Sequence, residues 1–208
     1  MLSYETIVTF MLASVLLSIA PGPDNIFVLI QSALHGRLAG VVVTLGLCTG
    51  LIFHTLAVAL GVAVIFQVSA VAFTLLKVVG VAYLIYLAWG AFRAASSSID
   101  GAEVPVLSRW SLYKRGILMS MTNPKLAIFF MAFLPQFADP ARGDLTHQLL
   151  LLGGLFIIAG FSVMATFALM SGFIREWFQT SPVGQRVINQ LAGVVFIGLA
   201  LKLLTTER

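Results

Sequence analysis

The 208-residue sequence has few charged residues and almost no cysteine. Only 10% of its residues are charged, against about 25% in an ordinary globular domain, and this excludes a water-soluble domain of the usual kind. The single cysteine, Cys48, has no partner for an internal disulfide. Because Cys48 lies inside an apolar stretch, we expect it to pack against neighbouring helices.

Lysine and arginine are absent ahead of Arg37. A cleavable signal peptide begins with a positively charged segment, so we expect the first apolar stretch to be retained. The three histidines, His35, His54 and His147, are scattered and form no HExxH or comparable motif. An intramembrane enzyme would need a nucleophile with its base, or a set of metal ligands. We therefore predict no enzymatic activity, no resident metal and no cofactor.

Apolar residues are what the sequence has in excess. They make up 60% of the chain, and the mean hydropathy is +1.03. A helix needs about 20 mostly apolar residues to cross the hydrocarbon layer of a membrane. Six stretches of this kind lie near residues 4–31, 39–66, 69–92, 114–136, 146–174 and 184–204. The sequence thus predicts an all-α integral membrane protein, surrounded by lipid, with six transmembrane helices.

The net charge of +4 would favour a nucleic-acid partner in a soluble protein, but here it reports orientation. If the N-terminus faces outward, the loops on the inner side hold seven basic residues and those on the outer side hold three. The seven are Arg37, Arg93, Arg109, Lys114, Arg115, Arg175 and Arg186, and the three are Arg142, Lys202 and Arg208. The positive-inside rule then predicts that both termini lie outside. We expect no nucleic-acid partner.

Two halves of the chain resemble each other across a Ser-rich polar stretch. "SIAPGPDNIFVL" from Ser18 recurs weakly as "SMTNPKLAIFFM" from Ser120, and "GVAYLIYLA" from Gly80 recurs as "GVVFIGLAL" from Gly193. We interpret the chain, 1–208, as one transmembrane domain with a repeat at about 4–93, a cytoplasmic linker at about 94–110 and a second repeat at about 111–205. Three helices per repeat place the second copy inverted in the membrane, an arrangement typical of secondary transporters.

Two spans contain residues that a hydrophobic helix should exclude. The interruptions are Pro21, Gly22, Pro23, Asp24 and Asn25 in the first span, and Asn123, Pro124 and Lys125 in the fourth. Proline removes a backbone donor and clashes with the carbonyl four residues earlier, so helices 1 and 4 should be broken near the midplane. Irregular backbone at this depth persists only where protein or water satisfies it. These eight residues are therefore the predicted substrate site.

Asp24 and Lys125 would carry opposite charges at equivalent positions of the two repeats. Such a site suits a zwitterion, with its ammonium on Asp24 and its carboxylate on Lys125 and on the free amides of a half-helix N-terminus. The alternative is a purely structural ion pair. Ionisable residues inside membranes are usually functional, which favours the substrate site.

Further candidates come from the remaining polar residues of the spans. Asp24 and His54 are candidates for proton coupling, although His54 could instead be hydrogen-bonded to a neighbouring helix. Thr49, Tyr83 and Tyr86 are candidates for lining the cavity, and interior packing is the alternative for the two tyrosines. Gly46, Gly50 and Gly61 have the small-residue spacing that predicts close helix packing.

Several blocks of the sequence match a known family. "APGPDN" followed by "QSALHGRLAGV", then "GLCTGLIFHTL", "GVAYLIYLAWGAFR" and "MTNPKLAIFFMAFLPQF", occur in order over nearly the whole chain. They resemble the lysine exporter and homoserine/threonine resistance (LysE/RhtB) family of bacterial amino-acid exporters. The resemblance implies a secondary active exporter of a small amino acid in the bacterial inner membrane, working by antiport with protons. It leaves the identity of the amino acid open.

Two other functions stay open at this point. A cation or heavy-metal exporter of the same superfamily would need clustered Asp, Glu, His or Cys ligands in its spans, and Asp24 stands nearly alone. A non-transporting membrane scaffold would not need two broken helices with charged breaks. A homodimer is compatible with the sequence, because the apolar face of any span could form its interface.

Overall fold

The computed structural model describes residues 2–20, 22–62, 70–93, 107–173 and 181–205. Within these ranges the regular secondary structure is helical, without strands, so the predicted all-α class is confirmed. The helices are α1 (Tyr4–Ile19), α2 (Pro23–His35), α3 (Arg37–Ala57), η1 (Val58–Val62), α5 (Ala70–Arg93), α6 (Arg109–Thr122), α7 (Pro124–Ile128), η2 (Phe129–Phe133), η3 (Leu134–Phe137), η4 (Pro140–Arg142), α8 (Leu145–Leu169) and α10 (Pro182–Thr205).

Several helices are long and apolar enough to cross a membrane. In the described part of the chain these are the unbroken helices Arg37–Gly61, Leu145–Leu169 and Val183–Thr205, and two bent pairs if each pair counts as one span. Large apolar side chains remain exposed on the surface, Leu60 at 67% and Val71 at 69% among them. A soluble monomer rarely exposes so much apolar surface. The chain is a multi-pass membrane protein.

The first predicted break lies between α1 and α2, whose axes are bent by 61°. Helix α1 ends at Ile19, and Ala20 leaves the helical conformation with φ −53° and ψ 123°. Helix α2 begins at Pro23, where the fixed φ of proline suits the first turn and its missing N–H costs no hydrogen bond. Pro21 lies outside the described residues.

The second predicted break lies between α6 and the segment Pro124–Phe137, bent by 51°. Asn123 is extended, and its side-chain oxygen accepts a hydrogen bond from the backbone N–H of Lys125 at 2.9 Å. Asn123 is thus the N-cap of α7 and Pro124 is its first residue, as the sequence predicts. Both predicted interruptions of the helices are present.

The start of α6 differs from the prediction. Helix α6 begins at Arg109, ahead of the expected start near residue 114. The reason is local, because Ser108 accepts a hydrogen bond from the backbone N–H of Ser111 and caps the helix. The rest of the predicted linker, residues 94–106, lies outside the described residues.

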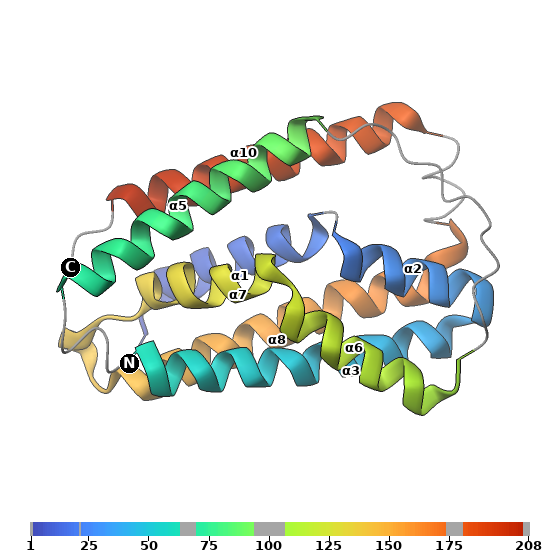
Figure 1. Ribbon diagram of the computed structural model, residues 1–208, viewed down its shortest axis with the longest axis horizontal. Coiled ribbons are helices and arrows are strands. Elements are labelled where there is room, and N and C mark those ends of the chain that lie inside the picture. Colours follow the sequence, from blue (N-terminus) through green and yellow to red (C-terminus); the bar gives the residue numbers. More distant parts are fainter. Residues whose placement is uncertain (1, 21, 63–69, 94–106, 174–180, 206–208) are drawn as a thin grey trace.

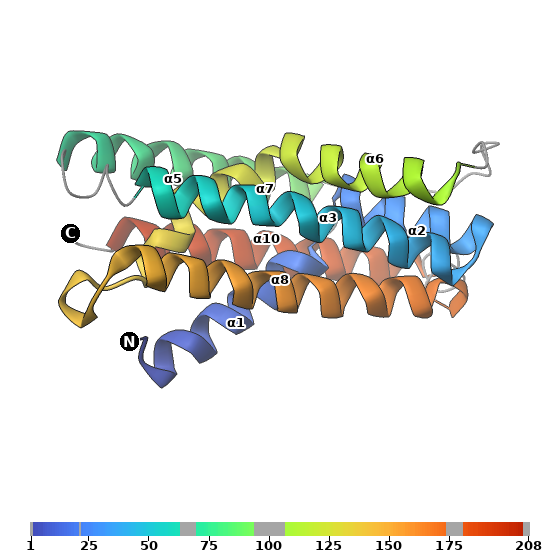
Figure 2. The ribbon, with the colours of Figure 1, turned by 90° about the horizontal axis from the view of Figure 1, so that it is seen from below.

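The helices pack in layers (Figure 1). Helices α5 and α10 form one pair, α3 packs against α6 and α8, and α1 and α7 lie between these groups. Helix α1 begins and α10 ends at one end of the molecule, whereas α6 begins at the other end (Figures 1 and 2). The two bent segments therefore run in opposite directions through the centre of the bundle.

Close packing of α3 on α6 positions the second break, because this break lies at the C-terminal end of α6. A Cβ on Gly46 would clash with the carbonyl oxygen of Tyr113, and one on Gly50 would lie 2.5 Å from the Cβ of Ser120. The predicted close approach is confirmed at these two glycines. It is wrong at Gly61, where an added Cβ would meet nothing within 4 Å because no described element packs against that position.

Aromatic rings hold the segment after the second break. The ring centroid of Phe129 lies 4.9 Å from that of Phe133 and 5.1 Å from that of Phe156 on α8. The ring centroid of Phe137 lies 5.0 Å from that of Phe10 on α1. All five side chains are buried. Aromatic pairs at such distances add to the stabilisation from burial, so they tie this segment to both α1 and α8.

Candidate functional site

The two helix breaks meet inside the bundle. The side-chain amide of Asn123 donates a hydrogen bond to the Oδ2 atom of Asp24 at 2.6 Å. Lys125 also belongs to the second break, and its Nζ atom donates to the carbonyl oxygens of Ala20 at 3.2 Å and Leu17 at 3.4 Å. Residues about a hundred positions apart in the sequence thus form one polar cluster. It lies where α1, α2 and α7 meet, inside the helix bundle.

The polar residues of this cluster are almost fully buried. The exposed fractions are 6% for Asp24, 4% for Asn25, 5% for Asn123 and 8% for Lys125. Burying ionisable and amide groups is unfavourable unless hydrogen bonds compensate for the lost water. A cluster of this composition at the centre of an apolar bundle therefore points to a function.

The broken end of α1 holds the ammonium group of Lys125. A helix leaves its last four carbonyl groups without intrahelical partners, and that end carries partial negative charge. Two of the acceptors belong to Leu17 and Ala20. Two of the three donors of this buried ammonium are thereby bonded to backbone carbonyl groups.

Asp24 and Lys125, both in the described part of the chain, form no direct ion pair. The carboxylate accepts from Asn123 and the ammonium donates to α1. The structural ion pair that the sequence left open is therefore absent from this conformation.

Gly22 makes room for the lysine. A Cβ at this position would lie 3.1 Å from the Nζ atom of Lys125. The backbone of Gly22 is extended, with φ −163°, so any residue could adopt it. Glycine is needed here for space and not for conformation.

Asn25 secures the other side of the break. Its amide donates to the carbonyl oxygens of Ser18 at 2.8 Å and Ile19 at 3.4 Å. The Oδ1 atoms of Asp24 and Asn25 are buried and have no hydrogen-bond partner. An unsatisfied buried acceptor costs about 1–3 kcal/mol. Two such oxygens on consecutive residues would be stabilised by a hydrogen-bond donor. A cationic donor would stabilise them most.

A cavity of about 40 Å³ adjoins Asp24 and Asn25. Small-molecule pockets usually measure about 300–1,000 Å³, so the site is closed in this conformation. The residues that line the cavity are Leu17, Ser18, Asp24, Asn25, Leu47, Cys48, Leu51, Ser120, Lys125, Leu126, Phe156, Gly160 and Met164.

Four other candidates from the sequence lie away from this cavity lining. His54 bonds through Nε2 to the carbonyl oxygen of Ser120 at 3.0 Å. Because a carbonyl only accepts, Nε2 carries the proton. Thr49 bonds to the hydroxyl of Tyr113 at 2.8 Å. Tyr83 and Tyr86 contact each other on α5, with ring centroids 5.9 Å apart.

Sequence reasoning missed several lining residues. Cys48 was expected only to pack against neighbouring helices, and it also lines the cavity. Ser18 and Ser120 begin the two repeated segments, a signal that could have identified them, and the Oγ atom of Ser120 is buried without a partner. The contributions from α8, such as Phe156 and Met164, carry no polar signal and depend on the packing of distant helices.

Within the described residues, no group of three or more His, Cys, Asp or Glu side chains lies close enough together to hold a metal ion. The runner-up function, metal export, therefore lacks a cluster of ligands in that part of the chain. The polar cluster is instead composed of one carboxylate, two amides and one ammonium.

The chain is similar to known bacterial membrane proteins over nearly its whole length. It is 34% identical over 196 residues to a homoserine/homoserine lactone efflux protein of Salmonella typhimurium, covering 94% of both chains. It is 29% identical over 203 residues to a leucine efflux protein of Salmonella choleraesuis, covering 96% of this chain and 94% of the relative. An uncharacterized membrane protein of Bacillus subtilis is 28% identical, covering 95% and 98%.

No solved structure shows significant similarity to the chain. The family model for the LysE type translocator matches residues 15–207, which include both helix breaks and every residue of the polar cluster. This chain is a member of the LysE type translocator family.

Proposed function

We propose that the chain exports a small amino acid, as its zwitterion, from the bacterial cytoplasm across the inner membrane. The family and the efflux activities named for two relatives support this function. The observation that carries the proposal is the pair of unpartnered oxygens on Asp24 and Asn25 beside the buried ammonium of Lys125. These groups match the two charges of an amino acid.

The ammonium group of the substrate binds at the free oxygens. An ammonium has three donors and no acceptor, and the Oδ1 atoms of Asp24 and Asn25 supply two acceptors that the fold leaves unused. Binding would satisfy both oxygens at once. A hydrogen bond from a cation to a carboxylate is about twice as strong as a neutral one.

The carboxylate group of the substrate binds to Lys125. In the closed conformation the Nζ atom donates to the end of α1, so the substrate must replace these carbonyl groups. A carboxylate is a stronger acceptor than a carbonyl because it is charged. Release of Lys125 from α1 frees the α1–α2 bend, and this movement enlarges the cavity.

Apolar side chains around the cavity suit an aliphatic substrate. Leu47, Leu51, Phe156 and Met164 line it together with the polar groups. Ligand sites are mostly apolar with a few polar groups that fix orientation. The substrate class is therefore a small neutral amino acid.

Proton coupling is assigned to Asp24. A protonated carboxyl group no longer attracts an ammonium ion, so protonation from outside would release the substrate, and the proton would be carried inward in exchange. His54 is the second candidate, because its ring contacts α6 at the carbonyl group of Ser120, near the cavity but without lining it.

Six spans arranged as two inverted three-helix repeats fit this mechanism, with both termini outside. The opposite directions of α1 and α6 support the inversion (Figure 1), and the distribution of basic residues supports the orientation. Alternating access would then exchange the roles of the two halves around one central site.

Counterflow in proteoliposomes tests the function. Vesicles preloaded with one of a panel of unlabelled amino acids should accumulate the labelled form of the transported one. Accumulation of a divalent metal would support the metal exporter. Absence of flux for every amino acid and metal, in protein that is folded and inserted, would support the scaffold.

A further inference from the structure

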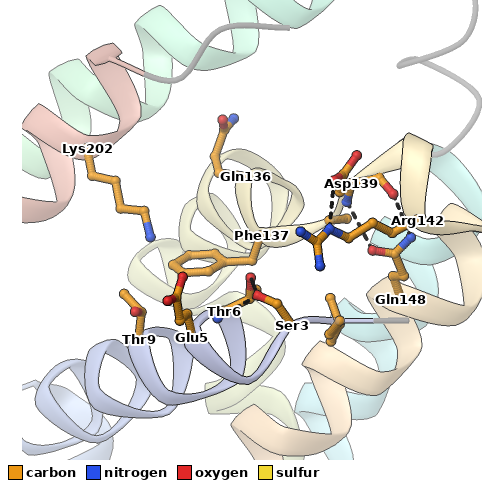
Figure 3. A pocket seen from close by; sticks show the side chains of 12 residues that line it. Ser3, Glu5, Thr6, Thr9, Gln136, Phe137, Asp139, Arg142, Gln148 and Lys202 are labelled. Carbon is orange, nitrogen blue, oxygen red and sulfur yellow. Dashed lines mark hydrogen bonds and ion pairs between the residues drawn. The ribbon is translucent and has the colours of Figure 1, made fainter.

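A second cavity, of about 380 Å³, lies where α1 begins and α10 ends (Figure 3). It falls within the usual volume range of small-molecule sites, about 300–1,000 Å³. The residues that line it are Leu2, Ser3, Glu5, Thr6, Thr9, Gln136, Phe137, Ala138, Asp139, Arg142, Gln148 and Lys202. We call it the end pocket.

The end pocket carries both signs of charge around an aromatic ring. Figure 3 shows the side chains of Glu5 and Lys202 extending toward Phe137 from α1 and α10. The Nζ atom of Lys202 lies 3.6 Å from the centroid of that ring, a cation–π contact that fixes the ammonium at the wall. Arg142 and Asp139 form an ion pair at 3.1 Å on another side.

One lining residue, Gln136, has a buried acceptor. The Oε1 atom of Gln136 has no hydrogen-bond partner, while its amide donates to the carbonyl oxygen of Ala132 at 3.2 Å. Because this oxygen is buried, the groups that the pocket offers at its surface are the carboxylate of Glu5 and the ammonium of Lys202 beside the ring of Phe137, among mostly polar residues. These are the same chemical groups that surround the central cavity.

The end pocket and the central cluster share two structural segments. Helix α1 contributes Glu5 and Thr9 to the pocket, and the carbonyl group of Ala20, at its other end, accepts from Lys125. The segment after the second break likewise has one end in each site. It begins with Lys125 in the central cluster and reaches the end pocket at Gln136 and Phe137. At 1.5 Å per residue the 16 residues of α1 extend about 24 Å. One pair of elements therefore connects both sites.

We propose that the end pocket is a second binding site for the zwitterionic amino acid, on the outward side of the central site. The substrate ammonium binds Glu5, and the substrate carboxylate binds Lys202. The inference rests on the proposed function and on the outward orientation of the N-terminus. An amino acid leaving the central site would occupy this pocket before it enters the external water.

Protection from thiol labelling tests the proposal. Cys48→Ser removes the native cysteine, and Thr9→Cys places a reporter in the end pocket at an exposed position. In proteoliposomes, leucine or homoserine should slow labelling by an external impermeant maleimide. Isopentylamine and 4-methylpentanoate each carry only one of the two charges. Their half-protecting concentrations should be at least tenfold higher.

Variants of the pocket make the test specific. Glu5→Gln and Lys202→Gln should each raise the half-protecting concentration about tenfold, the effect of one lost charge-assisted hydrogen bond. Lys77→Gln is the matched control. Its Nζ atom donates to the carbonyl oxygen of Leu204 at the same end of the molecule, and Lys77 does not line the pocket, so protection should be unchanged.

A Lys125→Ala background separates the two sites. Protection that persists there assigns binding to the end pocket, and protection that disappears overturns the proposal by assigning it to the central site. An unprotected or unlabelled Thr9→Cys in protein that performs counterflow also overturns it and leaves the proposed function standing. Failure of counterflow with protection intact would instead contradict the proposed function.

Discussion

Asn123 donates its side-chain amide to Asp24 across 2.6 Å, although 99 positions separate the two residues in the sequence. The oxygen of the same amide accepts from the backbone N–H of Lys125 and caps α7. One side chain therefore fixes the carboxylate of the first break and the backbone of the second. Movement of one break relative to the other changes the contact between Asn123 and Asp24, and this contact would couple the two breaks in the proposed transport cycle.

Asp24→Asn should abolish the stimulation of efflux by a pH gradient and leave part of the substrate exchange. The amide can still accept a hydrogen bond from an ammonium, but it cannot carry a proton. We expect exchange to fall about tenfold, since a charge-assisted hydrogen bond becomes a neutral one. Efflux and exchange are measured in proteoliposomes with and without an imposed gradient. Full gradient-driven transport by the variant would remove Asp24 as the proton carrier and make His54 the next candidate.

Lys125→Ala should weaken substrate binding about 10- to 100-fold, as expected for the loss of a hydrogen bond to a charged group. It also leaves the carbonyl groups of Leu17 and Ala20 without their donor. Lys125→Arg retains the charge and is the matched variant. The measurement is the substrate concentration that half-saturates counterflow, together with the melting temperature. Equal affinity in wild type and Lys125→Ala would contradict a role in carboxylate binding.

Gly22→Ala should disturb Lys125 without breaking the backbone. The added Cβ would lie 3.1 Å from the Nζ atom, so the ammonium must shift from its hydrogen bonds with α1. Gly154→Ala in α8 is the control, because a Cβ there meets nothing within 4 Å. We expect counterflow to fall several-fold for Gly22→Ala only. Parallel losses in both variants would point to a general effect of the substitution.

Tags at Ser97 and at the C-terminus should be reached from opposite sides of the membrane. The prediction follows from six spans with both termini outside, which places the linker in the cytoplasm. Accessibility of each tag to an impermeant reagent in intact cells and in inverted vesicles provides the measurement. Labelling of both tags from one side would require a different number of spans, with five the first alternative to consider.

Asp144 should stabilise the protein only at a pH where it is ionised. The backbone N–H of His147 donates to Asp144 at 2.8 Å and, as the N-cap contact of α8, holds the pKa of this carboxyl group below its usual 3.8. A lowered pKa means that the folded state favours the ionised form. The stabilisation is thus present above the pKa of the unfolded chain and is lost as the pH falls through the folded value.

Melting temperatures in detergent test this pH dependence. Asp144→Ala should melt below wild type at pH near 7, and Asp144→Asn, which keeps the acceptor oxygen, should lie between them. The difference between wild type and Asp144→Asn should be present at pH near 7 and should disappear at a pH below the lowered pKa of the folded state. An equal difference at both pH values would exclude ionisation as its cause.

The sequence by itself determined the environment, the helical class and the two breaks. Low charge and long apolar stretches require a membrane, and a membrane requires helices that satisfy their own backbone. Pro23 and Pro124 interrupt the preceding helix through local backbone geometry alone. The ends of α1 and α6 could therefore be located without knowledge of the fold. The polar side chains at these breaks are buried in the structure, and their role as the substrate site stays a prediction.

Tertiary structure decided what these side chains contact. Opposite charge suggested that Asp24 and Lys125 would face each other, yet Asn123 takes the carboxylate and the end of α1 takes the ammonium. Cys48 and Ser120 reach the cavity because Gly46 and Gly50 let α3 approach α6 closely. Glu5 and Lys202 enter one pocket because α1 and α10 meet at the same end of the bundle. Such contacts depend on the packing of helices far apart in the chain, and apolar sequence patterns do not specify which helices become neighbours.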